Sequence, residues 1–446
     1  MTDRIEKALK VARETKVFEL GHNVIPLAGE CFKQYFPLGK AVVVADCNTW
    51  PVAGEKVFEA LSSSGIPVER FIIPDRKFHA EWKYVEMVDE VLDRTGAVAV
   101  SAGSGVINDL CKLSSHHHAQ GYITVPTAAS VDGYTSFGAS ISYKGLKQTF
   151  DCPAPVAVLA DIDILATAPK EMTAAGYADL AAKIPCGAEW MIADLFGTEP
   201  IIPEAWHVLQ DSLDRMLSNP EGIAKGNPEA VGSLFEGLTL SGIAMQAARS
   251  SRPASCTDHL FSHYLDMTDH RFNGELQSHG FQVAVGTLVM CAFFDAFLEF
   301  DLSSLNVEKC AALWPSLEEE KERARHIFRD FVDPELGVRS IEVKYADREQ
   351  VRRQLLEVKN QWPELKKKYR AQVYPYEKMR SLFKTVGAPS SPGDIGVTNR
   401  QLFDMLPFVQ LMRHRINLLD LSRRALIYDT LVDKVFGRGG IFDIEK

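Results

Sequence analysis

Residues 97–112 read AVAVSAGSGVINDLCK, and this stretch decides the predicted fold. Its first part, Ala97–Ser101, is a short apolar run of the kind that forms a buried strand. The small residues Gly103, Ser104 and Gly105 follow, and the sequence after them has helical spacing. A strand that passes through a small-residue turn into a helix is the repeating unit of a parallel α/β sheet.

The same alternation extends over the first third of the chain. Four more β-branched runs are predicted strands, and helical segments separate them: Lys40–Asp46, Val68–Ile73, Tyr122–Pro126 and Val156–Ala160. A helix is expected to begin at Trp50-Pro51, with proline in its first turn. Ser140–Phe150 predicts a hairpin that turns at Lys144-Gly145. We therefore expect a parallel sheet that binds its ligands at the carboxyl ends of its strands.

From Ala168 onward the strand signals fade and apolar residues recur at helical spacing. The predicted helical segments, with a break at Pro363, are Pro169–Phe196, Pro203–Leu217, Pro228–Ser250, Cys256–Met267, Glu275–Leu298, Leu317–Phe331, Asp347–Ala371 and Asn399–Val435. The sequence thus predicts an α/β domain over residues 1–167 and an all-helical domain over residues 168–446.

Composition excludes several classes of protein. The chain has 446 residues and a net charge of −10 without a basic block, which argues against a nucleic-acid partner. It has no uninterrupted apolar run of about 18 residues, so no membrane-spanning helix is expected. The amino-terminal segment is charged and amphipathic and has no signal-peptide core. Eight scattered cysteines without a CxxC pair predict reduced thiols in a cytoplasmic protein.

Three histidines mark a candidate metal site, in which two imidazoles from successive helices could bind one ion. His259 and His263 are four residues apart, so on a helix they share one face. His279 follows a break at Asn273-Gly274 and opens a new apolar run. The residues around these histidines are apolar, and a buried imidazole needs a partner for each ring nitrogen, which a cation can supply. We take Asp179 as the candidate for a further ligand; the alternative is that the histidines only pack.

Three features of the α/β region are candidates for cofactor or substrate contacts. The turn Gly103–Gly105 would let backbone amides approach a pyrophosphate at a helix N-terminus, or it is a plain strand–helix turn. Asp132 could accept hydrogen bonds from substrate hydroxyls, or it caps a loop turn. Asp46, at the end of a strand, could hold an adenosine ribose, or it caps the following helix.

Taken in order, five motifs resemble those of the sn-glycerol-1-phosphate dehydrogenases: GSGVINDLCK, PTAASVDGYTS, GYADLAAK, SRPASCTDHLFSH and HGFQVAVGT. That family lies in the superfamily of dehydroquinate synthase, glycerol dehydrogenase and the iron-containing alcohol dehydrogenases. The resemblance extends from about Gly21 to Gly286. The Gly-Ser-Gly turn, in place of three glycines, is similar to the bacterial branch.

The resemblance implies a Rossmann-like amino-terminal domain and a helical carboxyl-terminal domain. It implies that Asp179, His259 and His279 bind one divalent metal ion, and this ligand set suits zinc or nickel and also iron. It further implies that Asp132, Asp179 and His263 contact the substrate. Residues expected to line NAD or NADP are Asp46, Gly103, Ser104, Gly105, Val106, Ile107, Thr127, Ala128, Ala129, Ser130 and Ser136.

The implied activity is the interconversion of dihydroxyacetone phosphate and sn-glycerol 1-phosphate by hydride transfer at C2, in a homodimer. One alternative is a sugar-phosphate cyclase of the dehydroquinate-synthase type or a polyol dehydrogenase on the same scaffold. In this superfamily the cyclases usually have Glu at the position of Asp179, which argues against the cyclase branch. A second alternative is a protein without catalytic activity.

Overall fold

The computed structural model describes residues 3–144 and 146–445, which form two compact units. The first unit contains the described residues up to Leu180, together with Pro203–Ala254 and Thr385–Gly387. The second contains Ala181–Ile202, Ser255–Lys384 and the described residues from Ala388 onward. The predicted domains 1–167 and 168–446 stay a prediction. The first compact unit reaches further along the chain than residue 167, because α12 (Pro228–Ala248) packs on α1 (Asp3–Val11) and α6 (Ile162–Leu165).

A six-stranded parallel sheet forms the centre of the first unit. Its strands lie in the order β1-β8-β5-β4-β2-β3, with the bounds β1 Val17–Gly21, β8 Ala157–Asp161, β5 Ile123–Pro126, β4 Val98–Gly103, β2 Ala41–Asp46 and β3 Val68–Ile73. Five of these strands are the predicted ones, so the α/β class is confirmed. β1 was not predicted. It is an edge strand that pairs only with β8 among the described strands.

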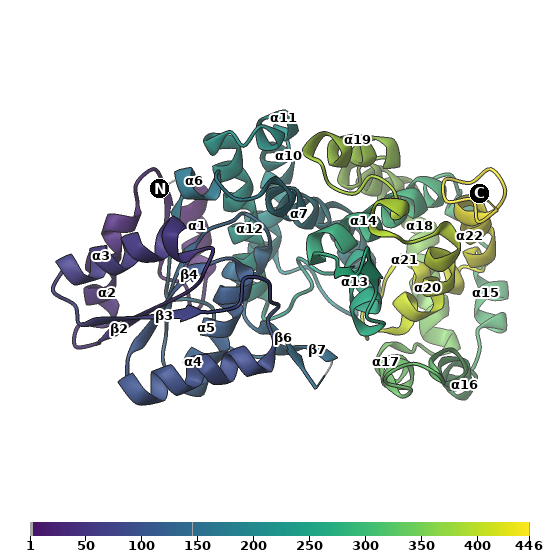
Figure 1. Cartoon of the computed structure of the whole chain (residues 1–446). Coiled ribbons are helices and arrows are strands. Elements are labelled where there is room, and N and C mark those ends of the chain that lie inside the picture. Colours follow the sequence, from purple (N-terminus) through teal and green to yellow (C-terminus); the bar gives the residue numbers. More distant parts are fainter. Residues whose placement is uncertain (1–2, 145, 446) are drawn as a thin grey trace. The chain divides into compact units, whose positions relative to one another are not determined.

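Two pairs of helices cover the two faces of this sheet (Figure 1). The helices α2 (Ala28–Tyr35) and α3 (Glu55–Ser63) share a core with Val43 and Ala45 of β2. On the opposite face, α4 (Trp82–Thr95) and α5 (Gly105–His117) share a core with Val42 and Val44. Both faces of β2 are therefore buried, which explains its uninterrupted apolar sequence.

The remaining short elements of this unit are η1 Ile25–Leu27, η2 Trp50–Gly54, η3 Asp132–Tyr134, α9 Pro203–Leu209, η4 Gln210–Ser212, α10 Leu213–Met216 and α11 Pro220–Ala224. The predicted hairpin is confirmed in its strands, β6 (Ala139–Tyr143) and β7 (Leu146–Phe150), which are antiparallel. Gly145, predicted at its turn, lies outside the described residues. The predicted helix start at Trp50-Pro51 is also confirmed, because η2 begins there and leads into α3.

Helices make up nearly all of the second unit. They are α8 Lys183–Leu195, α13 Thr257–Met267, α14 His279–Phe297, η5 Leu302–Ser304, α15 Val307–Leu313, α16 Leu317–Phe328, α17 Leu336–Lys344, α18 Arg348–Gln372, α19 Tyr376–Val386, η6 Pro392–Ile395, α20 Asn399–Leu411, α21 Leu418–Arg424 and α22 Tyr428–Phe436. Between α13 and α14 the short strands β9 (Arg271–Phe272) and β10 (Glu275–Leu276) form a hairpin. Its turn is Asn273-Gly274, and both of these residues have a positive φ.

The break predicted at Pro363 is wrong, because α18 continues through this residue. Pro363 is exposed, whereas the apolar residues at helical spacing on both sides of it are buried: Val351, Leu355, Val358, Trp362, Leu365 and Tyr369. Burial of this stripe stabilises the helix on both sides of the proline. It offsets the lost backbone hydrogen bond and the clash of the proline ring with the preceding turn, which together cost about 3 kcal/mol in a helix interior.

One helix of the described chain, α14, is long and apolar enough to cross a membrane, with a mean hydropathy of 1.6 over 18 residues. Within the structure, 89% of that window is buried. Its apolar side chains therefore form part of the protein core, since α14 packs against α8, α13 and α22.

Candidate metal and cofactor site

The structure brings together the three predicted metal ligands. Asp179 lies near the end of α7 (Lys170–Ala181), His259 lies in the first turn of α13, and His279 is the first residue of α14. Each offers one ligand atom, and these three atoms all lie within 4.8 Å of one another. Asp179 and His259 are buried and His279 is partly buried. Two imidazoles and one carboxylate at this spacing are a donor set that suits a divalent cation.

Neighbouring groups hold the second nitrogen of each imidazole. The Nδ1 atom of His259 donates to the carboxylate of Asp258 at 2.8 Å. The Nδ1 atom of His279 lies 2.9 Å from the hydroxyl of Ser262. That hydroxyl donates its own proton to Gln282, so it accepts from His279. Both imidazoles are therefore set to present Nε2 to an ion, which is the arrangement that metal-binding histidines ordinarily have.

The carboxylate of Asp179 is fixed by the loop that follows β5. Its Oδ2 atom accepts from the backbone N–H of Asp132 at 3.0 Å. Three residues earlier in α7, a Cβ atom added to Gly176 would lie 1.9 Å from the carbonyl oxygen of Ala129. Only glycine allows α7 to approach the loop this closely. The sequence GYADLAAK therefore combines a packing glycine with the carboxylate that it positions.

His263, predicted to contact the substrate, lies outside the three-ligand group. It is one turn after His259 on α13, and its ring centroid is 6.4 Å from that of His279. Its Nε2 atom lies 3.3 Å from the Nη2 atom of Arg413. Arg413 belongs to the loop between α20 and α21 and was not among the predicted site residues.

Asp132, the other predicted substrate contact, begins η3. Its backbone N–H donates to Asp179, and its Oδ2 atom accepts from the hydroxyl of Ser241 on α12 at 2.8 Å. Asp132 is partly exposed. This aspartate is thus tied at its backbone to a candidate metal ligand and at its side chain to the long helix α12.

The predicted pyrophosphate turn lies at the carboxyl end of β4. Gly103 ends the strand, Ser104 precedes α5, and Gly105 begins the helix. A Cβ atom on Gly103 would come within 2.6 Å of Ile107, and one on Gly105 within 2.7 Å of Val131. Ser104, Gly105 and Val106 are partly exposed, whereas Gly103 and Ile107 are buried. Partly exposed amides at the N-terminus of a 13-residue helix suit an anionic phosphate group.

The turn also lies where the strand order of the sheet reverses. β2 pairs with β3 on one side and with β4 on the other, so the crossover connections diverge between β2 and β4. In open parallel sheets, ligands bind outside the carboxyl ends of the strands at such a point. Asp46 ends β2 and Gly103 ends β4, so two predicted cofactor contacts flank it.

Asp46 has a structural role in the described chain. Its Oδ1 atom accepts from the backbone N–H groups of Asn48 at 2.7 Å and Thr49 at 2.9 Å. These bonds close a turn ahead of η2, whose N-cap residue is Thr49, so Asp46 is not the helix cap that the sequence offered as the alternative. Its contact with a ribose stays a prediction.

The second predicted cofactor segment, Thr127–Ser130, is buried directly after β5. Its first backbone N–H, that of Thr127, donates to the carbonyl of Gly103 and so joins the two cofactor segments. The carbonyl of Ala128 accepts from the hydroxyl of Tyr134 at 2.9 Å, and burial raises the pKa of that phenol. Ala129 is the residue against which Gly176 packs.

A buried lysine that the prediction missed holds the end of this loop. The Nζ atom of Lys112, on α5, donates to the carbonyls of Gly133 at 2.8 Å, Ser136 at 2.9 Å and Gly138 at 3.0 Å. Ser136, predicted to line the cofactor, is buried, and its hydroxyl donates to Gly133. Lys112 lies between the apolar residues Cys111 and Leu113, and this sequence pattern was the signal that the lysine is buried.

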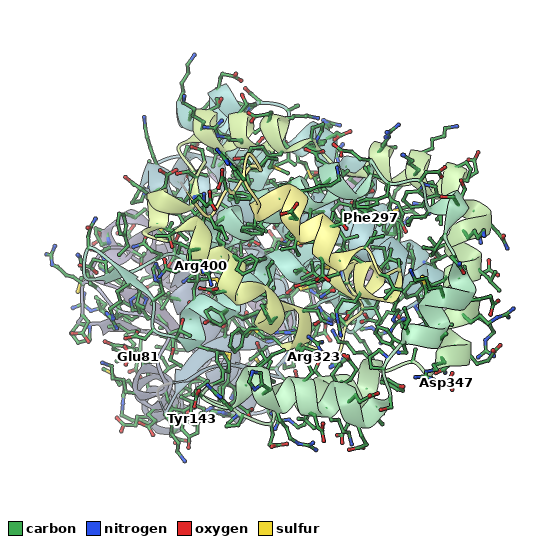
Figure 2. The ribbon with its side chains drawn as sticks, turned by 90° about the vertical axis from the view of Figure 1, so that its right-hand side faces the viewer. Glu81, Tyr143, Phe297, Arg323, Asp347 and Arg400 are labelled. Carbon is green, nitrogen blue, oxygen red and sulfur yellow. A yellow bond between two sulfur atoms is a disulfide. The ribbon has the colours of Figure 1, made fainter. Side chains whose placement is uncertain are left out.

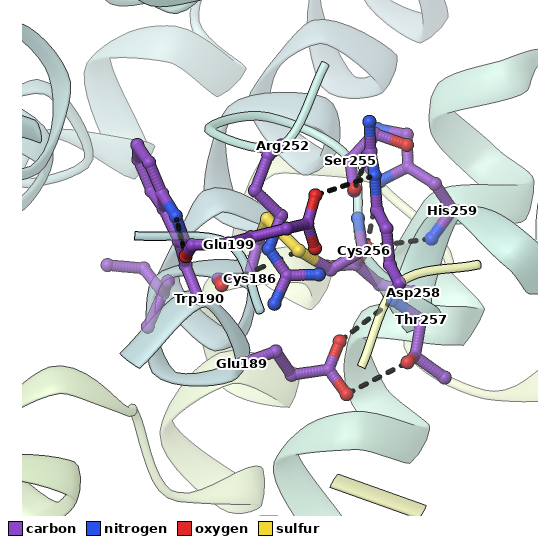
Figure 3. Close-up of a disulfide and its surroundings, with 12 residues drawn as sticks. Cys186, Glu189, Trp190, Glu199, Arg252, Ser255, Cys256, Thr257, Asp258 and His259 are labelled. Carbon is purple, nitrogen blue, oxygen red and sulfur yellow. Dashed lines mark hydrogen bonds and ion pairs between the residues drawn. A yellow bond between two sulfur atoms is a disulfide. The ribbon is translucent and has the colours of Figure 1, made fainter. Parts of the chain in front are cut away.

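Glu189 of α8 orders the start of α13, as Figure 3 shows. Its two carboxylate oxygens accept from the backbone N–H and the hydroxyl of Thr257 at 2.9 and 2.8 Å. Oε1 also accepts from the backbone N–H of Leu418 at the start of α21. One buried carboxylate thereby connects α8 to the N-termini of two helices, close to His259.

The expectation that all eight cysteines are reduced is wrong for one pair. Cys186 of α8 and Cys256, directly before α13, form a disulfide, and their Cα atoms are 5.1 Å apart (Figure 3). The other six cysteines are free. Sequence could not reveal the pair, because the two residues are 70 positions apart.

The disulfide is expected to stabilise the protein measurably. Closing a loop of 70 residues lowers the entropy of the unfolded chain and contributes about 4 kcal/mol in the chain-entropy model. We expect dithiothreitol to lower the thermal unfolding midpoint of the wild type but not that of the Cys186→Ser/Cys256→Ser double variant. Thiol titration in denaturant should find six reactive groups without reductant; eight would contradict the bridge.

Asp258 is expected to set metal affinity through His259. Because its carboxylate accepts from Nδ1, Asp258→Ala should weaken metal binding about 10- to 100-fold. Asp258→Asn can keep a hydrogen-bond acceptor without the charge, so it should lose less. Metal competition with a chromophoric chelator measures both constants. Equal affinity in wild type and Asp258→Ala would show that this contact does not tune the site.

Comparison with known proteins places this chain in a class and then in a family. Residues 19–169 match the family model of the iron-containing alcohol dehydrogenases. The fold agrees, since glycerol dehydrogenase from Schizosaccharomyces pombe superposes with a TM-score of 0.56. That superposition covers 94% of this chain and 89% of the other at 17% identity.

Two curated relatives are more similar in sequence. Glycerol-1-phosphate dehydrogenase [NAD(P)+] from Halalkalibacterium halodurans is 33% identical over 285 residues, which are 63% of this chain and 71% of that protein. The protein of the same name from Geobacillus thermodenitrificans is 31% identical over 332 residues, or 72% of this chain and 78% of that protein. The chain belongs to the glycerol-1-phosphate dehydrogenase family.

Proposed function

We propose that this protein is a metal-dependent, NAD(P)-linked dehydrogenase that interconverts dihydroxyacetone phosphate and sn-glycerol 1-phosphate. One observation carries the proposal: the ligand atoms of Asp179, His259 and His279 lie within 4.8 Å of one another. Each of these side chains has a separate hydrogen-bond partner that orients it. Membership of the family and the names of the relatives support the same activity.

In this proposal Asp179, His259 and His279 hold one divalent ion, which is zinc or nickel, with iron as a further possibility. The ion would act as a Lewis acid on the C2 oxygen, and the nicotinamide would exchange a hydride with C2. Three protein ligands leave coordination positions for substrate oxygens, as catalytic sites require. The buried positions of Asp179 and His259 keep water away from two of the three donors.

The remaining predicted residues divide between substrate and cofactor. Asp132 and His263 contact the substrate, and Asp179 also lies beside it. The amides of Gly103–Ile107 bind the pyrophosphate of NAD or NADP at the start of α5. The other residues proposed to line the cofactor are Asp46, Thr127, Ala128, Ala129, Ser130 and Ser136. The predicted domain division assigns cofactor binding to residues 1–167 and metal binding to residues 168–446.

The test is a coupled assay with purified protein loaded with zinc, nickel or iron. Dihydroxyacetone phosphate should cause oxidation of NADH or NADPH, and chelated protein should lose this activity. In the reverse direction sn-glycerol 1-phosphate, and not its 3-phosphate enantiomer, should reduce the cofactor. A metal-loaded protein that oxidises neither nicotinamide would refute the proposal. The same assay distinguishes a dehydrogenase from a cyclase, because a cyclase returns the hydride to its substrate and shows no net NADH turnover.

We further propose that the protein is a cytoplasmic homodimer, on the basis of the family resemblance. Light scattering after size-exclusion chromatography measures the mass directly. A mass of 49.6 kDa, that of one chain, would contradict the dimer.

A further inference from the structure

The loop between α20 and α21, residues 412–417, carries the sequence Met-Arg-His-Arg-Ile-Asn. Two contacts in the second unit fix it beside α13. The Nη1 atom of Arg415 donates to the carbonyl of Ser255 at 2.7 Å. Leu418, directly after the loop, donates its N–H to Glu189 at 3.0 Å. Both contacts lie on the carboxyl-terminal side of Arg413. On its other side α20, which packs on α13, ends two residues before Arg413.

The surroundings of Arg413 are unusual for a guanidinium. It is only partly exposed, and burial lowers its pKa. Among the described residues its hydrogen-bond partner is the Nε2 atom of His263, at 3.3 Å, and no carboxylate forms an ion pair with it. An arginine can only donate hydrogen bonds, so Nε2 of His263 accepts this one. The guanidinium has further N–H groups that can donate to a ligand. Desolvating a cation costs free energy unless an anion compensates it.

Three other cations inside the same unit have that compensation, whereas the buried Arg424 donates to the side-chain amide oxygen of Gln354. Arg423 donates to the two carboxylate oxygens of Glu320 at 2.6 and 2.7 Å. Arg323, labelled in Figure 2, lies 3.2 Å from the same carboxylate. Lys344 forms an ion pair with Asp420 at 2.9 Å. Arg413 differs from these residues because its counter-ion is not supplied by the described chain.

Arg413 also lies close to the candidate metal site. It contacts His263, whose ring centroid is 6.4 Å from that of the ligand His279. A triose phosphate carries its phosphate on the carbon next to the reacting C2, so an anion site is needed near the ion. A guanidinium fork matches phosphate oxygens in charge and geometry.

We propose that Arg413 binds the phosphate monoester of the triose substrate and thereby selects phosphorylated over unphosphorylated substrates. This inference rests on the proposed function. His263 is the side chain that holds the guanidinium in place. A phosphate monoester also occurs on the adenosine ribose of NADP, and the experiment distinguishes this source from the substrate.

The test compares Arg413→Gln and Arg413→Lys with the wild type and with Arg329→Gln. Arg329 is an exposed arginine paired with Asp330, so its replacement is a matched control. We expect Arg413→Gln to lower kcat/KM for dihydroxyacetone phosphate about 100-fold, as loss of hydrogen bonds to a charged group does. Activity with unphosphorylated dihydroxyacetone should stay within about twofold, and Arg413→Lys should recover part of the loss because it keeps the charge.

Three outcomes for Arg413→Gln would overturn the inference. An equal loss of kcat/KM with both substrates would indicate a structural role. A rise in KM for NADPH alone would assign Arg413 to the cofactor, and an unchanged kcat/KM for dihydroxyacetone phosphate would show that Arg413 does not bind this substrate. A binding measurement shows whether Arg413 binds phosphate independently of whether the proposed dehydrogenase activity is correct. Inorganic phosphate should raise the thermal midpoint of the wild type and of Arg329→Gln but not of Arg413→Gln, whether or not the wild type turns over dihydroxyacetone phosphate.

Discussion

Replacing His259 with alanine is expected to remove the bound metal ion and to lower kcat/KM for dihydroxyacetone phosphate by at least about 10³-fold. The reason is that a Lewis acid contributes several kcal/mol to stabilising the transition state, and each 1.4 kcal/mol corresponds to a tenfold change in rate. The variant also leaves Asp258 without the imidazole to which it now bonds. Elemental analysis of purified protein measures the metal, and a steady-state assay measures the rate.

A matched control for this variant is His207→Ala. His207 lies on α9, its side chain is 68% exposed, and it pairs with Asp211 one turn later. It should keep full metal content and activity. If His259→Ala retained one equivalent of metal and wild-type turnover, the histidines would serve packing alone, and the assignment of His259 as a ligand would be wrong.

Gly286→Ala is expected to destabilise the protein by about 3 kcal/mol and to weaken metal binding at the same time. Gly286 lies on α14, and a Cβ atom there would be 2.2 Å from the backbone carbonyl oxygen of Asp258 on α13. Backbone cannot rotate away as a side chain can, so the two helices must separate. Their separation changes the distance between His259 and His279, because each helix carries one of these ligands.

Denaturant unfolding and metal competition measure the two effects of Gly286→Ala. Gly393→Ala is the control, since the nearest atom to its added Cβ would be 3.8 Å away. This control should change stability by less than about 1 kcal/mol. An unchanged midpoint for Gly286→Ala would mean that α13 and α14 tolerate a wider spacing than the structure has.

The sheet was predictable because its inner strands carry a strong local signal. Both faces of β2 and β4 are buried, so AVVVAD and VAVSAG are continuous apolar or small-residue runs. The edge strand β1, with the sequence VFELG, has one fully buried residue, Phe18, and a charged Glu19. Its alternation is too short to distinguish it from a loop. The start of α14 was predicted at Glu275, four residues early, because the β9–β10 hairpin has only two residues in each strand.

The candidate site was only partly predictable. His259 and His263 are four residues apart, so helical spacing alone relates them. Asp179 is 80 positions before His259, and no local spacing relates it to the histidines. Asp258 was not predicted, although it adjoins His259. A carboxylate in the first turn of a helix is common because it interacts favourably with the helix dipole, so it does not by itself indicate a site. Arg413 is 150 positions after His263, and no local pattern connects a loop arginine to a helix so distant in sequence.

The carboxylate of Asp258, which orients His259, has a consequence for the charge of the site. An ion of charge +2 is balanced by the two negative charges of Asp179 and Asp258, while both imidazoles are neutral. Removing the ion would take its positive charge away from two carboxylates, in a region where Asp179 is fully buried and Asp258 almost so. Protons are the simplest replacement, so hydrogen ions and the metal should compete for the same place. The protein would then lose its metal in acid and release protons when it takes the metal up again.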